Sequence, residues 1–139
     1  MYLVRLIYAS SVTEAFKPGD IENILESARL RNVQDNVTGM LCFNQNYFLQ
    51  CLEGSRTSVN GVYHRILNDP RHTKPVLLDY QEILTREFTD WAMGYISESS
   101  LTAPLNLKFS GTPFFEPYSM SGESCHQMML ELREGVPVL

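Results

Sequence analysis

The stretch VTGMLCFNQNYFLQCLE, residues 37–53, contains two β-rich runs joined by Asn44-Gln45-Asn46. Asparagine tolerates a positive φ angle better than most residues, which suits a tight turn between two strands. The runs at 37–44 and 46–53 are therefore predicted to form a hairpin. The remaining elements can be placed outward from this hairpin by the spacing of their apolar residues.

A strand and a helix are predicted before the hairpin. Residues 2–10 are mostly apolar on both faces, which indicates a central strand covered on both sides. Lys17-Pro18-Gly19-Asp20 is typical of a helix start, with proline in the first turn. Apolar residues then recur at helical spacing, namely Ile21, Ile24, Leu25 and Ala28. Asn32 lies four residues beyond Ala28 on the same stripe.

A second helix is predicted after the hairpin, with Ser55 as its cap and its end by Asp69-Pro70. Its apolar stripe is Val59, Val62, Tyr63 and Ile66. Two further strands are predicted at 76–84 and 91–97. The order β-α-β-β-α-β-β predicts an α+β fold, the ferredoxin-like split βαβ sandwich with both helices on one sheet face.

The C-terminal part has two weaker helical segments, 101–108 and 122–133. Met128, Met129 and Leu132 are expected to pack on the second sheet face. The predicted division is a main domain at 1–97 and a C-terminal helical cap at 98–139 that covers this face.

Composition narrows the class of protein. The chain has 139 residues and a net charge of −5 without a basic run, which argues against a nucleic-acid partner. No apolar stretch approaches the roughly 20 residues that span a bilayer. Three cysteines without CxxC spacing indicate neither a disulfide framework nor a metal site. A cytoplasmic protein is expected.

Four residues carry polar or sulfur groups where a core is expected. Gln50 shares a strand face with Phe48 and Leu52, and Tyr8 continues the face of Val4 and Leu6. Taken singly, each has an ordinary structural explanation: a core glutamine bonded to backbone, a buried tyrosine, Asn32 as a helix C-cap, and Met93, in phase with Trp91, as core filler.

Together these polar groups predict a ligand site. If the first, third and last strands lie near one another, Tyr8, Gln50 and Asn32 converge between the two helices. A planar heterocycle with carbonyl and N–H groups, such as an isoalloxazine ring, would use their donors and acceptors. Its apolar surface would be flanked by Ile24, Leu25 and Ile66.

Basic residues follow the second helix. Arg65, Arg71 and His72 near its C-terminus could simply interact with the helix dipole. Alternatively, Arg71 and His72 contact a phosphate while Asp69 accepts a hydrogen bond from a ribityl hydroxyl.

Six segments, in order and at matching spacing, resemble the BLUF family of blue-light photosensors. They are LIYAS at 6–10, RN at 31–32 followed by NVTGML at 36–41, FLQCLEG at 48–54, YHRI at 63–66, DPRH at 69–72 and FTDWAM at 88–93. Arg31 stands where many members have the first of two asparagines. The tail resembles that of short, stand-alone cyanobacterial-type members, which carry two C-terminal helices and no effector domain.

This resemblance implies a photoreceptor with non-covalently bound FAD, or alternatively FMN or riboflavin. Tyr8 would be the electron and proton donor, and Gln50 would connect it to the flavin. Asn32 would bond the carbonyl and N3 edge of the ring, and Met93 and Trp91 would lie in a strand that changes with light. The resemblance also implies no enzymatic activity, a homo-oligomer, and a downstream, response-regulator-like partner.

Three other functions stay open from the residues themselves. Acylphosphatases share the predicted architecture, but residues 9–16 lack a glycine-rich phosphate loop. A flavin oxidoreductase would need a nicotinamide site, and no GxGxxG motif is present. A regulatory module that binds a colourless small molecule would use the same polar slot.

Overall fold

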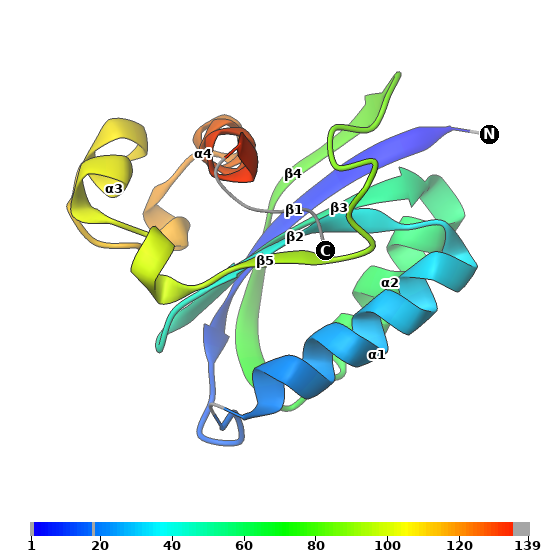
Figure 1. Cartoon of the computed structure of the whole chain (residues 1–139), viewed down its shortest axis with the longest axis horizontal. Helices are drawn as coiled ribbons and strands as arrows, with labels where there is room; N and C mark the ends of the chain where they lie inside the picture. Colours follow the sequence, from blue (N-terminus) through cyan, green and yellow to red (C-terminus); the bar gives the residue numbers. More distant parts are fainter. Residues whose placement is uncertain (1, 18, 135–139) are drawn as a thin grey trace.

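The computed structural model describes residues 2–17 and 19–134 and contains one five-stranded sheet with helices on both faces (Figure 1). Pro18, expected in the first helical turn, lies outside the described residues. The elements are β1 Leu3–Val12, α1 Asp20–Asp35, β2 Thr38–Phe43, β3 Tyr47–Ser55, α2 Arg56–Leu67, β4 His72–Ile83, β5 Gly94–Ile96, α3 Ala103–Phe109 and α4 Gly122–Glu134. Short 3₁₀ turns at Glu98–Ser100 and Pro117–Ser119 flank α3.

The strand order in the sheet is β4-β1-β3-β2-β5. The first four strands pair antiparallel, and β5 pairs parallel with β2. Helices α1 and α2 lie on one face of the sheet and α4 lies on the other (Figure 1). The α+β prediction, a ferredoxin-like split βαβ sandwich with an added strand, is confirmed.

Local chemistry explains where the two main helices begin and end. The Ser55 hydroxyl accepts a hydrogen bond from the Ser58 N–H at 3.2 Å, so the predicted cap of α2 is confirmed. Helix α1 ends at Asn36, which adopts a left-handed φ of 55°. Asn32 therefore lies inside the helix, and its alternative interpretation as a C-cap is wrong.

Two hydrophobic clusters lie on the two faces of the sheet. The cluster under α1 and α2 includes Leu6, Leu52 and Val59, all with side chains at most 1% exposed. The other cluster lies between α4 and the opposite face of β1, β2 and β3. It includes Met128, Met129 and Leu132, as expected. Because both faces are covered, the central strands are apolar on both sides.

The segment before β5 differs from the prediction. The strand expected at 91–97 is limited to Gly94–Ile96, because the Trp91 N–H donates to Phe88 O at 3.0 Å and closes a turn. Trp91 packs in the cluster under α4, whereas Met93 packs in the cluster under α1 and α2. The expected common phase of Trp91 and Met93 is therefore wrong: the alternation of side chains requires an extended strand, which this turn interrupts.

The last strand is also farther from the first and third strands than expected. Strands β1 and β3 are direct neighbours, but β2 separates β3 from β5. The Met93 side chain, which precedes β5, nevertheless reaches Gln50 of β3.

Candidate functional site

A cavity of about 260 Å³ lies between the sheet and helices α1 and α2. Its lining residues are Tyr8, Ile24, Ser27, Ala28, Arg31, Asn32, Leu41, Phe48, Gln50, Val62, Arg65, Ile66, Asp69, Arg71 and His72. The volume is close to the lower end of the range of about 300–1,000 Å³ for small-molecule sites.

Tyr8, Gln50 and Met93 form a chain of contacts at the floor of the cavity. The Tyr8 hydroxyl donates to Gln50 Oε1 at 2.5 Å, and Gln50 Nε2 donates to Met93 Sδ at 3.4 Å. All three side chains are buried. Sulfur is a weak acceptor, so the amide N–H has a weaker partner than the amide oxygen has. A ligand carbonyl or ring nitrogen above the floor could take its place.

The backbone register brings this pair together. Tyr8 and Gln50 are opposite each other in the β1–β3 ladder, and Leu41 is opposite Gln50 in the β2–β3 ladder. Burial, with smaller contributions from Tyr63 and Asp69, raises the pKa of Tyr8 far above its ordinary value. The phenol therefore keeps its proton over the physiological pH range and can act as a donor to Gln50.

Helix α1 supplies one wall of the cavity. Ile24, Ala28 and Asn32 follow each other at four-residue spacing and line the cavity from one face of the helix. Asn32 is buried, and its Nδ2 donates to Ala92 O at 2.8 Å. This bond fixes the amide, whose Oδ1 remains an acceptor available to a ligand.

At one end of the cavity, two charged side chains are paired with each other. The Arg71 guanidinium contacts both carboxylate oxygens of Asp69, at 2.6–3.1 Å. These bonds lower the pKa of Asp69 and raise that of Arg71. The pair is charged and oriented, so Asp69 presents acceptors and Arg71 donors to the same end of the cavity.

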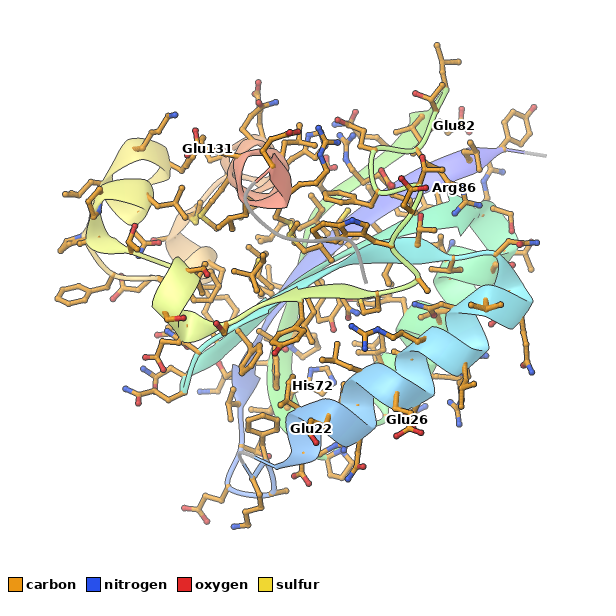
Figure 2. All side chains as sticks on the ribbon, in the orientation of Figure 1. Glu22, Glu26, His72, Glu82, Arg86 and Glu131 are labelled. Carbon is orange, nitrogen blue, oxygen red and sulfur yellow. The ribbon has the colours of Figure 1, made fainter. Side chains whose placement is uncertain are left out.

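His72 is held at the same end by two polar partners. Its Nε2 lies 2.5 Å from Ile66 O and its Nδ1 lies 2.8 Å from Ser10 Oγ. Because a carbonyl only accepts, Nε2 carries a proton. Figure 2 places His72 on the side of the sheet that faces α1.

The mouth of the cavity is basic. Arg65, on α2, is exposed and bridges to α1 through Asp35 Oδ2 at 2.9 Å. Arg31 and Ser27, on α1, are exposed and line the same opening. An anionic group that extends from a ligand in the cavity would meet these residues.

The structure places nine of the ten residues predicted to contact a cofactor in the lining: Tyr8, Ile24, Asn32, Gln50, Arg65, Ile66, Asp69, Arg71 and His72. Leu25 is outside it. Its side chain is buried in the core and borders a separate hollow between α1 and β5. Because Leu25 follows Ile24 by one residue, it is rotated by about 100° around the helix, away from the cavity.

Sequence reasoning missed several lining residues. Ala28 and Arg31 follow Ile24 by four and seven residues, so helical spacing alone could have placed them in the lining. Phe48 shares the strand face of Gln50, so alternation along β3 could also have placed it there. Leu41 depends on the pairing of β2 with β3, which the hairpin predicted without fixing which residues are opposite each other. Trp91 lies on the opposite face of the sheet.

The residues of the cavity fit a flavin. Apolar walls from α1 and α2 flank a floor with a buried hydroxyl and a buried amide, and a second buried amide lies at the edge. This donor and acceptor set matches a flat ring with alternating carbonyl and N–H groups. The carboxylate and basic residues beyond the floor match a polyol and a phosphate.

The chain is similar to known light-sensing proteins. The model of the family "BLUF: Sensors of blue-light using FAD" matches residues 3–94. The blue light- and temperature-regulated antirepressor BluF of Escherichia coli is 41% identical over 80 residues, which are 56% of this chain and 20% of that protein. The chain spans at most a fifth of the curated relatives that it matches.

Two solved structures resemble almost the whole chain. The BlsA photo-activated state has a TM-score of 0.85 at 30% identity and covers 94% of both chains. The BlrB dark-state structure has a TM-score of 0.77 at 30% identity and covers 94% of this chain and 97% of that one.

Within residues 2–17 and 19–134, no group of three His, Cys, Asp or Glu side chains could hold a metal ion. Over the same residues, no helix has the length and hydropathy needed to cross a membrane.

Proposed function

This chain belongs to the BLUF family of sensors of blue light using FAD, and on that premise we propose that it is a blue-light photoreceptor that binds a flavin non-covalently. The observation that carries the proposal is the Tyr8–Gln50–Met93 chain of contacts at the floor of the cavity. FAD is the proposed flavin, because the basic mouth at Arg31 and Arg65 suits the phosphates beyond the ring.

The proposed photochemistry uses the two buried polar side chains. A bound flavin supplies the absorption of blue light and an acceptor for one electron. Tyr8 donates an electron, and its proton moves along the 2.5 Å hydrogen bond to Gln50. When the electron and proton return, Gln50 is left rotated or tautomerised and donates a new hydrogen bond to the ring carbonyl. Because Gln50 is buried, no water competes for that bond.

The proposed output runs from Gln50 through Met93 to the segment before β5 and then to α4. Three contacts of this segment support the route. Glu87 Oε1 lies 2.9 Å from Nε2 of His126 on α4. Arg133, also on α4, donates to Glu87 O at 2.7 Å. Trp91 belongs to the same hydrophobic cluster as α4. A shift of this segment would therefore change how α4 rests on the sheet.

We propose that the output is a protein–protein interaction rather than catalysis, with a response-regulator-like partner and a light-dependent change of a homo-oligomer. One relative, BluF of Escherichia coli, is a blue light- and temperature-regulated antirepressor. The division into a flavin domain at 1–97 and a helical cap at 98–139, as in short cyanobacterial-type members, is part of the proposal. The packing of Met128, Met129 and Leu132 on the sheet supports this division. The three free cysteines suit a cytoplasmic location.

An absorption spectrum of the purified protein tests the function. It is recorded in the dark, after a blue flash and during recovery. We expect a flavin spectrum that shifts slightly to the red and returns without bleaching. Bleaching of the flavin would instead favour an oxidoreductase, and a colourless protein that takes up no added flavin would favour a module with another ligand.

A further inference from the structure

Helix α1 holds the backbone of the two residues before β5. Arg29 Nε donates to Met93 O at 3.0 Å, and Asn32 Nδ2 donates to the preceding carbonyl, Ala92 O, at 2.8 Å. The ladder between β2 and β5 begins only at Gly94, which pairs with Met40. The carbonyls of residues 92 and 93 thus accept hydrogen bonds from two helix side chains, where those of a strand would accept them from the neighbouring strand.

The residues on both sides are fixed in other ways. Gly39 N donates to Trp91 O at 2.9 Å, which attaches Trp91 to β2. The Trp91 ring lies against Gly94 so closely that a Cβ on Gly94 would be 1.9 Å from Trp91 Cε3. Between these anchors, the backbone of Ala92 is held by Asn32 and that of Met93 by Arg29.

Arg29 is placed at a cost to stability. Its Nη2 is buried and has no hydrogen-bond partner among the described residues. A buried donor without a partner lowers the stability of the fold. The position of this guanidinium is therefore not explained by stability alone. The acidic residues Glu22 and Glu26 of the same helix are exposed and extend from α1 (Figure 2), while Arg29 bonds inward to the backbone of Met93.

Met93 connects Arg29 to the photochemical pair. Its carbonyl oxygen is bonded to Arg29, and its sulfur accepts from Gln50 Nε2 at 3.4 Å. Tethering the backbone of Met93 keeps the sulfur where the amide of Gln50 can return to it. Loss of the tether would leave the sulfur free to move and the returning amide without a fixed partner.

We propose that Arg29 is a positioning residue that holds Met93 against Gln50 and thereby sets how fast the light-induced state returns to the dark state. This inference rests on the proposed photoreceptor function. Arg29 lies outside the lining of the cavity, so it acts through Met93 and not on the flavin.

The rate of dark recovery after a blue flash tests this role. Arg29→Ala should recover more slowly than the wild type by about threefold to tenfold, the range expected for loss of one hydrogen bond. Its flavin content and the size of its red shift should be unchanged. Arg29→Lys, which can still donate to Met93 O, should restore most of the rate. Arg29→Met keeps the apolar stem without the donor and carries the test if Arg29→Ala does not fold.

Two controls separate positioning from general destabilisation. Arg56→Ala removes a positive charge that is paired with Glu82 at the surface, and it should recover like the wild type. In a Met93→Leu background, Arg29→Met should change the rate very little, because the sulfur contact is already absent. The inference would be overturned if Arg29→Met recovered at the wild-type rate. It would also be overturned if Arg29→Met slowed recovery equally in the wild-type and Met93→Leu backgrounds. A wild type without any red shift would instead overturn the proposed function.

Discussion

Tyr8 and Gln50 are opposite each other in the antiparallel ladder of β1 and β3, and the Tyr8 hydroxyl donates to Gln50 Oε1 at 2.5 Å. Side chains of a strand alternate between its two faces, so a slip of one residue would turn one of the pair toward α4. The proposed photochemistry therefore depends on features that fix the register of the sheet and the segment packed beside it.

Gly39 is one of these features. A Cβ at this position would lie 1.9 Å from the backbone oxygen of Cys51 in the neighbouring strand. Gly39→Ala should therefore lower the free energy of unfolding by about 1–3 kcal/mol or more, because the strands must separate. Urea unfolding followed by circular dichroism in the dark measures the change.

Gly61 offers a matched control. It lies inside α2, and a Cβ there meets nothing within 4 Å. Gly61→Ala should raise the free energy of unfolding by about 0.5–1 kcal/mol, because alanine favours a helix interior over glycine. Equal effects of the two substitutions would show that the close approach at Gly39 is not important.

The amide of Gln50 should matter for the light response more than for flavin binding. Gln50→Leu keeps the volume of the side chain but leaves the buried Tyr8 hydroxyl without its acceptor. We expect a bound flavin without a red shift, and a loss of about 1–3 kcal/mol in unfolding free energy. Gln45→Leu, at an exposed position of the hairpin turn, is the control for both measurements. A red shift retained in Gln50→Leu would contradict the proposed role.

The environment of Trp91 can be followed directly, because it is the only tryptophan of the chain. It is 4% exposed, and its ring occupies the space where a Cβ of Gly94 would lie. Gly94→Ala should displace the ring, move its fluorescence emission to longer wavelength and increase quenching by acrylamide. An emission spectrum equal to that of the wild type would mean that the ring is not held at Gly94.

Stability should fall in mild acid because of His126. Burial, and next the nearby Arg5, lower the pKa of His126 below its ordinary value, although Glu87 acts in the opposite direction. A histidine with a depressed pKa stabilises the fold above its unfolded pKa of about 6.5, and this contribution is lost as the pH falls through the folded pKa.

A comparison with His126→Gln isolates this effect. The quantity to compare is the unfolding free energy of the wild type minus that of His126→Gln. This difference should decrease below pH 6.5, by at most about 1.4 kcal/mol per pH unit. Glu53, whose pKa is raised mainly by burial, is present in both proteins, so its titration cancels in the difference. Parallel stability curves for the two proteins between pH 5 and 7.5 would contradict the assignment.

Much of the fold could be predicted because local patterns determine it. The apolar stripe of α2 and the capping residue Ser55 define that helix without any tertiary contact. The strand predicted at 91–97 is shorter in the structure, Gly94–Ile96, for the opposite reason. Its shape depends on the bonds of Trp91 to Phe88 and Gly39, and the latter is far away in the sequence.

The same distinction applies to the candidate site. Tyr8 and Gln50 were found because their polar groups interrupt an apolar face, a local signal. Arg29 could not be found in that way, because an arginine on a helix is ordinarily a solvent-exposed residue. Its importance follows only from the carbonyl of Met93, 64 residues away, that it contacts.

The most direct test of the account is the light-minus-dark absorption spectrum of Tyr8→Phe, measured beside the wild type and Tyr63→Phe. The Tyr63 ring lies 5.3 Å from that of Tyr8, and its own hydroxyl is not part of the proposed relay, so it serves as the matched control. We predict that all three proteins bind flavin, that the wild type and Tyr63→Phe shift reversibly to the red, and that Tyr8→Phe does not shift. A normal red shift in Tyr8→Phe would contradict the assignment of Tyr8 as the donor.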